Sequence, residues 1–360
     1  MKILYAIQAT GNGSISRANE IIPVLENKCD LDILISGGET NIQLEHFIRY
    51  RRKGLNFEIG KKGGIDFLAT LKNLNSKKFL SEIKSFPIEE YDLVINDFEP
   101  ISAWSAKIKN VPCISLSHQF AILHKEAPRP EKIDPMAWIV LKHYAPVKDG
   151  IGFHFKGNGE NIFTPIIRHD IRRAFVRNLG HYSVYLPAFH EKKLIKIFSN
   201  FKDIEWHIFS RHCKSSYGKG NCWVRPVNMY EFTSSVINCE GIITGAGFET
   251  TSEALYLKKK LLTVSTKHHY EQYCNARSLK EMGVPVIKSL RKRNLAKLVK
   301  WLKEPQQIKV DFPDQTEMIV DLILSRFSSS VKKRSVRQRD EMKQIFLQDK
   351  QPESVQTVRY

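Results

Sequence analysis

Short apolar runs alternate with helical segments along the first half of the chain. Runs fit for buried parallel strands occupy residues 2–7, 31–36, 93–97 and 111–116, and a lysine-rich helical stretch occupies residues 67–86. This order predicts parallel strands joined by crossover connections.

The pattern begins again after a break. Turn residues cluster between positions 148 and 165, and strand-like runs follow at 181–186, 206–210, 236–244 and 260–264. A chain of 360 residues also exceeds the usual span of one domain. We therefore predict an α/β fold of two Rossmann-like, doubly wound parallel-sheet domains, at residues 1–155 and 165–327.

Basic residues outnumber acidic ones by 56 to 38, which gives a net charge of +18 and favours anionic partners. Residues 291–303 combine lysines with the apolar Leu295, Leu298, Val299 and Leu302. That segment fits either an ordinary domain helix packed on the sheet or a helix lying on an anionic membrane surface. Residues 328–360 are basic and poor in large apolar groups, so we expect a mobile tail.

Several classes of protein are disfavoured. The six cysteines form no CxxC pair, and His212, Cys213 and Cys222 lack a fourth ligand nearby, so we expect no metal and a cytoplasmic protein. No apolar run approaches a membrane span, and the first residues do not read as a signal peptide. Nucleic acid is an unlikely partner because zinc-ligand, helix-turn-helix and RNP-like patterns do not stand out.

A glycine turn in the second half carries the clearest chemistry. Gly245 and Gly247 follow a strand and precede a helix expected to begin at 249–251, whose unpaired N–H groups favour a diphosphate. Glu253, in an early helical turn, is placed to accept hydrogen bonds from ribose hydroxyls. The alternative is that such a turn occurs in any α/β protein and that Glu253 merely complements the helix dipole.

A second glycine turn follows the first strand. It contains Gly11, Asn12, Gly13 and Ser14, and it precedes an amphipathic helix through Leu25.

The residues Gly245, Ala246, Gly247 and Glu253 resemble the sugar-donor signature of GT-B glycosyltransferases, especially the MurG-like and UDP-glycosyltransferase-like groups. The resemblance implies two domains facing a central cleft, with a last helix, here 316–327, packed back across the first domain. It also implies sugar-donor contacts, with Thr250 and Thr251 at the diphosphate, Glu271, Gln272 and Asn275 in a loop at the sugar, Ser210 beneath the nucleotide, and Val227 in a turn over 225–228 at the base.

The amino-terminal turn departs from the related pattern, which reads Gly-Asn-Gly-His-Ile-Ser-Arg, because Ser14 replaces the histidine. A serine hydroxyl is a poor general base near neutral pH. The candidate bases elsewhere are Asp97 and His118, each at the end of a predicted strand. Asp97 could equally serve as a cap or turn residue, and His118 as a structural histidine.

The resemblance implies a glycosyltransferase that moves a sugar from a nucleotide-sugar, UDP-linked by expectation, to a lipid, polysaccharide or small-molecule acceptor. The displacement would be metal-independent and inverting, without a cofactor. One alternative is a nucleotide-sugar 2-epimerase of the same fold. The other is a non-catalytic basic protein that binds nucleic acid or an anionic membrane surface, and peripheral binding to the inner face of the membrane is compatible with the transferase as well.

Overall fold

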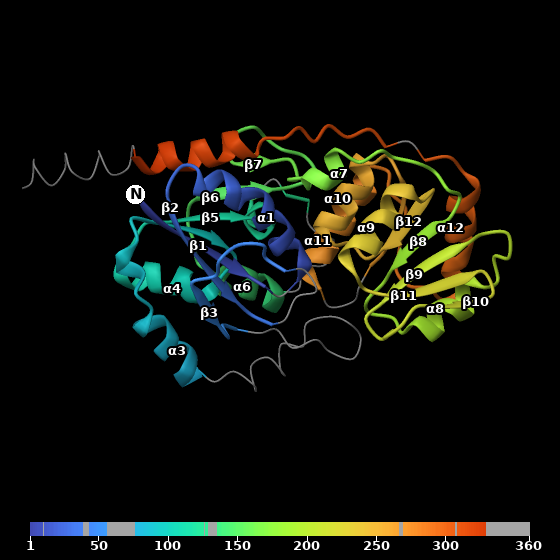
Figure 1. Ribbon diagram of the computed structural model, residues 1–360, viewed down its shortest axis with the longest axis horizontal. Coiled ribbons are helices and arrows are strands. Elements are labelled where there is room, and N and C mark those ends of the chain that lie inside the picture. Colours follow the sequence, from blue (N-terminus) through green and yellow to red (C-terminus); the bar gives the residue numbers. More distant parts are fainter. Residues whose placement is uncertain are drawn as a thin grey trace, which may run out of the picture. The chain divides into compact units, whose positions relative to one another are not determined.

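The computed structural model describes residues 1–9, 11–38, 43–55, 76–125, 127–128, 135–265, 269–306 and 308–328. The chain divides into a unit of Met1–Thr316 and a unit of Glu317–Tyr360. In its described residues, the first unit contains two seven-stranded sheets, which Figure 1 draws in blue to green and in green to orange.

All strands of the first sheet are parallel, in the order β3-β2-β1-β4-β5-β6-β7. Its strands are β1 (Lys2–Gln8), β2 (Asp30–Ser36), β3 (Tyr50–Arg52), β4 (Leu93–Asp97), β5 (Cys113–Ser117), β6 (Gly150–Phe153) and β7 (Ile162–Phe163). The connecting helices are α1 (Asn12–Glu26), α3 (Ser76–Ser85), the 3-10 helix η1 (Ile88–Glu90), α4 (Pro100–Lys109), α5 (His118–Leu123) and α6 (Pro135–Tyr144). Central β1 is apolar without alternation because both of its faces are buried, and its residues 3–7 are fully inaccessible.

The second sheet has the order β10-β11-β9-β8-β12-β13-β14 and is parallel except for the antiparallel pair of β10 and β11. Its strands are β8 (Tyr182–Tyr185), β9 (Trp206–Ser210), β10 (Tyr217–Lys219), β11 (Cys222–Pro226), β12 (Gly241–Thr244), β13 (Lys260–Val264) and β14 (Val286–Ile287). Its helices are α7 (His169–Arg172), α8 (Glu191–Phe198), α9 (Met229–Asn238), α10 (Phe248–Tyr256), α11 (Tyr270–Glu281) and α12 (Lys292–Lys303). The two predicted parallel-sheet domains are thus confirmed, and their limits at 155, 165 and 327 stay predictions.

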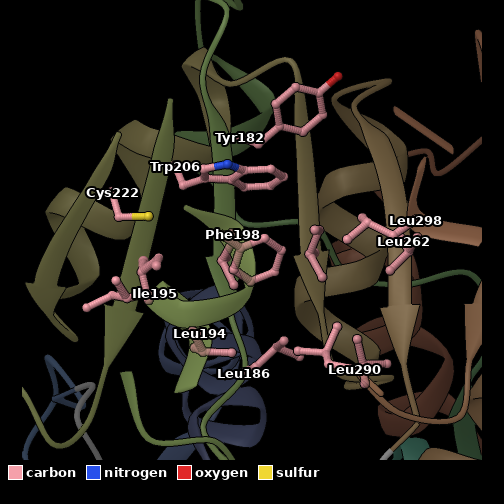
Figure 2. Packing of buried hydrophobic residues seen from close by; sticks show 14 of the residues in the cluster. Tyr182, Leu186, Leu194, Ile195, Phe198, Trp206, Cys222, Leu262, Leu290 and Leu298 are labelled. Carbon is pink, nitrogen blue, oxygen red and sulfur yellow. The ribbon is translucent and has the colours of Figure 1, made fainter. Parts of the chain in front are cut away.

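The core of the second sheet shows what the apolar side of the basic helix α12 packs against. Phe198 and Trp206 are fully buried with ring centroids 4.5 Å apart, and Figure 2 shows them together in this cluster. Leu298 and Trp301 of α12 belong to the same cluster, with Leu295 and Leu302 packed against it. The apolar stripe of α12 therefore lies on the sheet, as in an ordinary domain helix, rather than on a bilayer.

Four local predictions are wrong. The strand predicted over 236–244 begins only at Gly241, because Asn228 caps α9 through the Glu231 N–H and keeps residues 229–238 helical. The turn predicted over 225–228 begins inside β11, where Arg225 and Pro226 pair with β9.

The other two corrections concern the site. The amino-terminal glycine turn is shorter than predicted, because Gly11 is the N-cap and α1 already starts at Asn12. Residues 271–275, predicted as a loop, form the first turns of α11. A helix repeats its side chains every 3.6 residues, so Glu271 and Asn275 share one face of α11.

Part of the prediction lies outside the described residues. Of the predicted helix over 67–86, the structure describes α3, while residues 67–75 fall outside. Residues 316–328 are helical, as predicted, and the packing of that helix on the first domain stays a prediction. The basic tail lies outside the described residues after position 328.

Candidate functional site

A cavity of about 320 Å³ collects residues from both sheets of the first unit. Its wall includes many of the predicted site residues, namely Gly11, Asn12, Gly13, Ser14, Asp97, His118, Val227, Gly247, Thr250, Glu253, Glu271 and Gln272. Ser210, Gly245, Ala246, Thr251 and Asn275 are not among the described residues that line it. The strand ends of both sheets thus contribute to one cavity, which has the size of a small-molecule site.

The amino terminus of α10 is open toward this cavity. Gly247 is the N-cap, and no side chain caps the helix. A Cβ at Gly247 would meet no atom within 4 Å, and its φ of −70° is ordinary. The missing side chain at Gly247 therefore leaves the backbone of this turn open to close approach by a ligand. The Thr251 hydroxyl donates to the Gly247 carbonyl at 2.6 Å, so it satisfies the helix itself.

Glu253, the predicted ribose ligand, is held by an arginine that sequence reasoning missed. Arg168 Nε and Nη2 donate to the two carboxylate oxygens of Glu253 at 2.6 and 3.1 Å, and Nη2 also donates to the Thr233 hydroxyl at 3.1 Å. Burial raises the pKa of Glu253, and Arg168 opposes that rise. Each carboxylate oxygen keeps a second lone pair for a ligand hydroxyl.

Asp97, a predicted base, is paired with Arg17. Arg17 Nη2 donates to both oxygens of Asp97 at 2.9 and 2.8 Å, and Nε donates to one at 3.1 Å. Both side chains are almost fully buried. Burial raises the pKa of Asp97, and the Arg17 guanidinium opposes the rise. The remaining nitrogen, Arg17 Nη1, donates to Glu249 of α10 at 2.6 Å and so joins the two sheets.

His118, the other predicted base, also connects the two sheets. Its Nδ1 lies 2.7 Å from the Phe153 carbonyl and its Nε2 lies 2.8 Å from Asn275 Oδ1, while Asn275 Nδ2 donates to the Ala246 carbonyl at 3.0 Å. The His118 ring stacks on Phe248 with centroids 3.8 Å apart. Neither ring nitrogen is left open to the cavity in this arrangement, and the catalytic roles of Asp97 and His118 stay predictions.

Ser14 cannot replace the missing histidine in this geometry. Its hydroxyl donates to the Gln8 carbonyl at 2.6 Å. A hydroxyl engaged in this way stabilises the junction of β1 and α1, and its high intrinsic pKa makes it a poor proton acceptor.

Two amide oxygens in the cavity wall lack partners. Gln119 Nε2 donates to Glu271 Oε2 at 3.1 Å, which fixes the amide so that its oxygen points elsewhere. In the part of the chain that the structure describes, Oε1 of Gln119 and Oε1 of Gln272 are buried without a hydrogen-bond partner. Buried acceptors of this kind suit ligand hydroxyls. Gln272 was predicted from the sequence, whereas Gln119 was not.

Within the described ranges, no group of three or more His, Cys, Asp and Glu side chains could hold a metal ion. None of the helices resolved in those ranges has the length and apolar character to cross a bilayer.

Comparisons with known proteins agree with this fold. The family described as Glycosyl transferase family 1 matches residues 1–304. Phytolacca americana UGT2, solved in complex with UDP-2fluoro-glucose and pterostilbene, is 12% identical with a TM-score of 0.56 over 91% of this chain and 99% of that chain. MurG of Acinetobacter baumannii is 13% identical with a TM-score of 0.55 over 90% and 99%. A UDP-N-acetylglucosamine 2-epimerase is 12% identical with a TM-score of 0.54 over 91% and 97%. No curated relative matches the sequence.

The two Rossmann-like domains and their shared cavity define a GT-B glycosyltransferase fold. The family match extends over most of the chain and includes both sheets. The protein belongs to glycosyl transferase family 1 and is a glycosyltransferase.

Proposed function

We propose that the protein transfers a sugar from a UDP-sugar to a hydroxyl acceptor by a metal-independent, inverting displacement. The observation that supports this most directly is the open amino terminus of α10 beside the unpartnered amide oxygens of Gln119 and Gln272. The helix end suits a diphosphate, and the amide oxygens suit the hydroxyls of the attached sugar.

The remaining wall of the cavity fits the same ligand. Glu253, oriented by Arg168, is proposed to accept hydrogen bonds from the ribose hydroxyls, and Val227 is proposed to lie at the base. Thr250 lines the cavity in the first turn of α10, where it can reach the diphosphate. The fixed N–H groups of α10 would stabilise the charge that develops on the departing diphosphate without a metal.

The acceptor is proposed to enter from the amino-terminal domain. Asp97 and His118 are the candidates for its deprotonation, and each would first have to exchange its present partner for the acceptor. A side chain without such a partner could act as the base without this exchange. The variants Asp97→Asn and His118→Asn are assayed with a saturating UDP-sugar and varied acceptor. The substitution that removes the base should lower kcat strongly and change the KM for the acceptor little.

Calorimetric titration with UDP, GDP and dTDP tests the sugar-donor site. We expect saturable binding that prefers UDP and that remains at raised salt concentration. Binding that disappears with salt and does not distinguish the bases would instead reflect the positive surface charge. Incubating UDP-N-acetylglucosamine without an acceptor tests the epimerase alternative, because formation of the 2-epimer would contradict simple transfer.

A further inference from the structure

The carboxylate of Glu249 occupies a place suited to a ligand anion. Glu249 belongs to the first turn of α10, and its side chain crosses to α1 of the other sheet. A Cβ at Gly13 would overlap this carboxylate, so the side chain lies directly against the first turn of α1. Both helices present their amino-terminal turns to the cavity. An anion there is favoured by the two helix ends even without a basic side chain.

Arg17 supplies that basic side chain in a fixed orientation. Asp97 holds its Nε and Nη2, the guanidinium lies 5.3 Å from the Phe153 ring centroid, and the side chain is only 4% exposed. These contacts leave Nη1 as the nitrogen that faces α10, and Glu249 accepts from it at 2.6 Å. Glu249 is 24% exposed, so its carboxylate has open space to turn into, whereas the Arg17 guanidinium is held by Asp97 and Phe153.

A diphosphate at the open end of α10 would meet this carboxylate. Two anions in one partly buried site repel one another, and a fixed guanidinium binds whichever of them remains. Arg168 and Arg211 also line the cavity, but Arg168 is committed to Glu253. Arg17 Nη1 is the buried cationic donor that a displaced Glu249 would release.

We propose that Glu249 is an internal competitor for the diphosphate of the sugar donor, and that Arg17 binds this diphosphate after Glu249 has moved away. The inference rests on the proposed function, because it takes the ligand to be a nucleotide-sugar. It assigns Arg17 as a sugar-donor-binding residue contributed by the amino-terminal domain. Glu249 then sets how strongly α1 and α10 are joined while no ligand is bound. It also sets how readily the site accepts the ligand.

The test is calorimetric titration of UDP and of uridine into the wild type and two matched variants. Glu249→Gln keeps the shape of the side chain and removes its charge, and we expect it to bind UDP about three- to tenfold more tightly. Uridine lacks the diphosphate, so its affinity should not change. Glu231→Gln is the control, because Glu231 also lies in the first turn of a helix of the second sheet, α9, and its side chain is not among the described partners of Arg17. That variant should bind UDP like the wild type.

A second pair of variants tests the role of Arg17. In an Arg17→Lys background, which keeps a cation opposite Asp97, the gain from Glu249→Gln should shrink to less than about twofold. The inference is overturned if the wild type binds UDP but Glu249→Gln leaves its affinity unchanged or weaker. It is also overturned if Glu231→Gln tightens binding equally, since the effect would then be general charge. Failure of the wild type to bind UDP at all would refute the proposed function itself.

Discussion

Arg168 and Glu253 form a two-point ion pair, with Nε–Oε1 at 2.6 Å and Nη2–Oε2 at 3.1 Å, although 85 residues separate them in the chain. Arg168 precedes α7, and Glu253 lies inside α10. The pair fixes the carboxylate before any ligand arrives. A carboxylate held in this way loses little conformational entropy when a ligand binds to it.

Glu253→Gln should weaken UDP binding by about 1–3 kcal/mol, because a neutral amide accepts hydrogen bonds from hydroxyls less strongly. The sharper measurement compares UDP with its 2′,3′-dideoxy analogue by calorimetry. The wild type should discriminate between the two ligands, and the variant should do so much less. Equal discrimination in both proteins would remove Glu253 from the ribose site. A thermal melt of the variant controls for loss of the Arg168 pair.

Asp97→Asn should lower the free energy of unfolding by about 3 kcal/mol, because it leaves the partly exposed Glu249 as the remaining described anionic partner of the buried Arg17 charge. Urea denaturation measures this loss. Asp170→Asn is the control, since Asp170 pairs with Arg168 at 3.1 Å but is 57% exposed, and its loss should stay below about 1 kcal/mol. Similar losses in the two variants would contradict the view that burial makes the Arg17 pair important.

Acidification should destabilise the protein through His154. Burial lowers the pKa of His154 to about 4, from an ordinary value of 6.5, and its Nε2 lies 3.1 Å from the Ser278 hydroxyl of α11. Between these two pH values the unfolded chain binds more protons than the folded one. The free energy of unfolding must therefore fall as the pH drops from about 6.5 toward 4.

His154→Gln removes this titration, and the variant should lose about 3 kcal/mol less than the wild type between pH 7 and pH 4. Urea denaturation at a series of pH values gives the comparison. The same loss in both proteins would show that other groups, among them His181, whose pKa burial also lowers to about 4, carry the acid sensitivity.

Phe198→Ala should lower the free energy of unfolding by about 3–5 kcal/mol, because Phe198 is fully buried against Trp206. Phe175→Ala is the matched control, as this phenylalanine is 78% exposed and should change stability by no more than about 0.5 kcal/mol. Chemical denaturation followed by tryptophan fluorescence measures both. A small effect at Phe198 would mean that the core of the second sheet can collapse around the gap.

The strands were predictable because their signal is local. The runs at 2–7, 31–36 and 260–264 correspond to β1, β2 and β13 within a residue or two, since the buried part of a parallel strand is mostly apolar on both faces. The error at 236–244 has the same origin. Val236 and Ile237 are apolar in the last turn of a helix, and a short apolar run does not distinguish a buried helical turn from a strand.

The contacts within the site were decided by the tertiary structure alone. Sequence motifs indicated Glu253, Asp97, His118 and Asn275, but not that Arg168 binds the first, that Arg17 binds the second, or that the last two bind each other across 157 residues. The sequence by itself determined where most of the central strands lie and which family the chain resembles, because periodicity and turn chemistry act over a few residues. Which charges meet depends on the order of strands in two sheets and on how those sheets face one cavity, and no local pattern records that order.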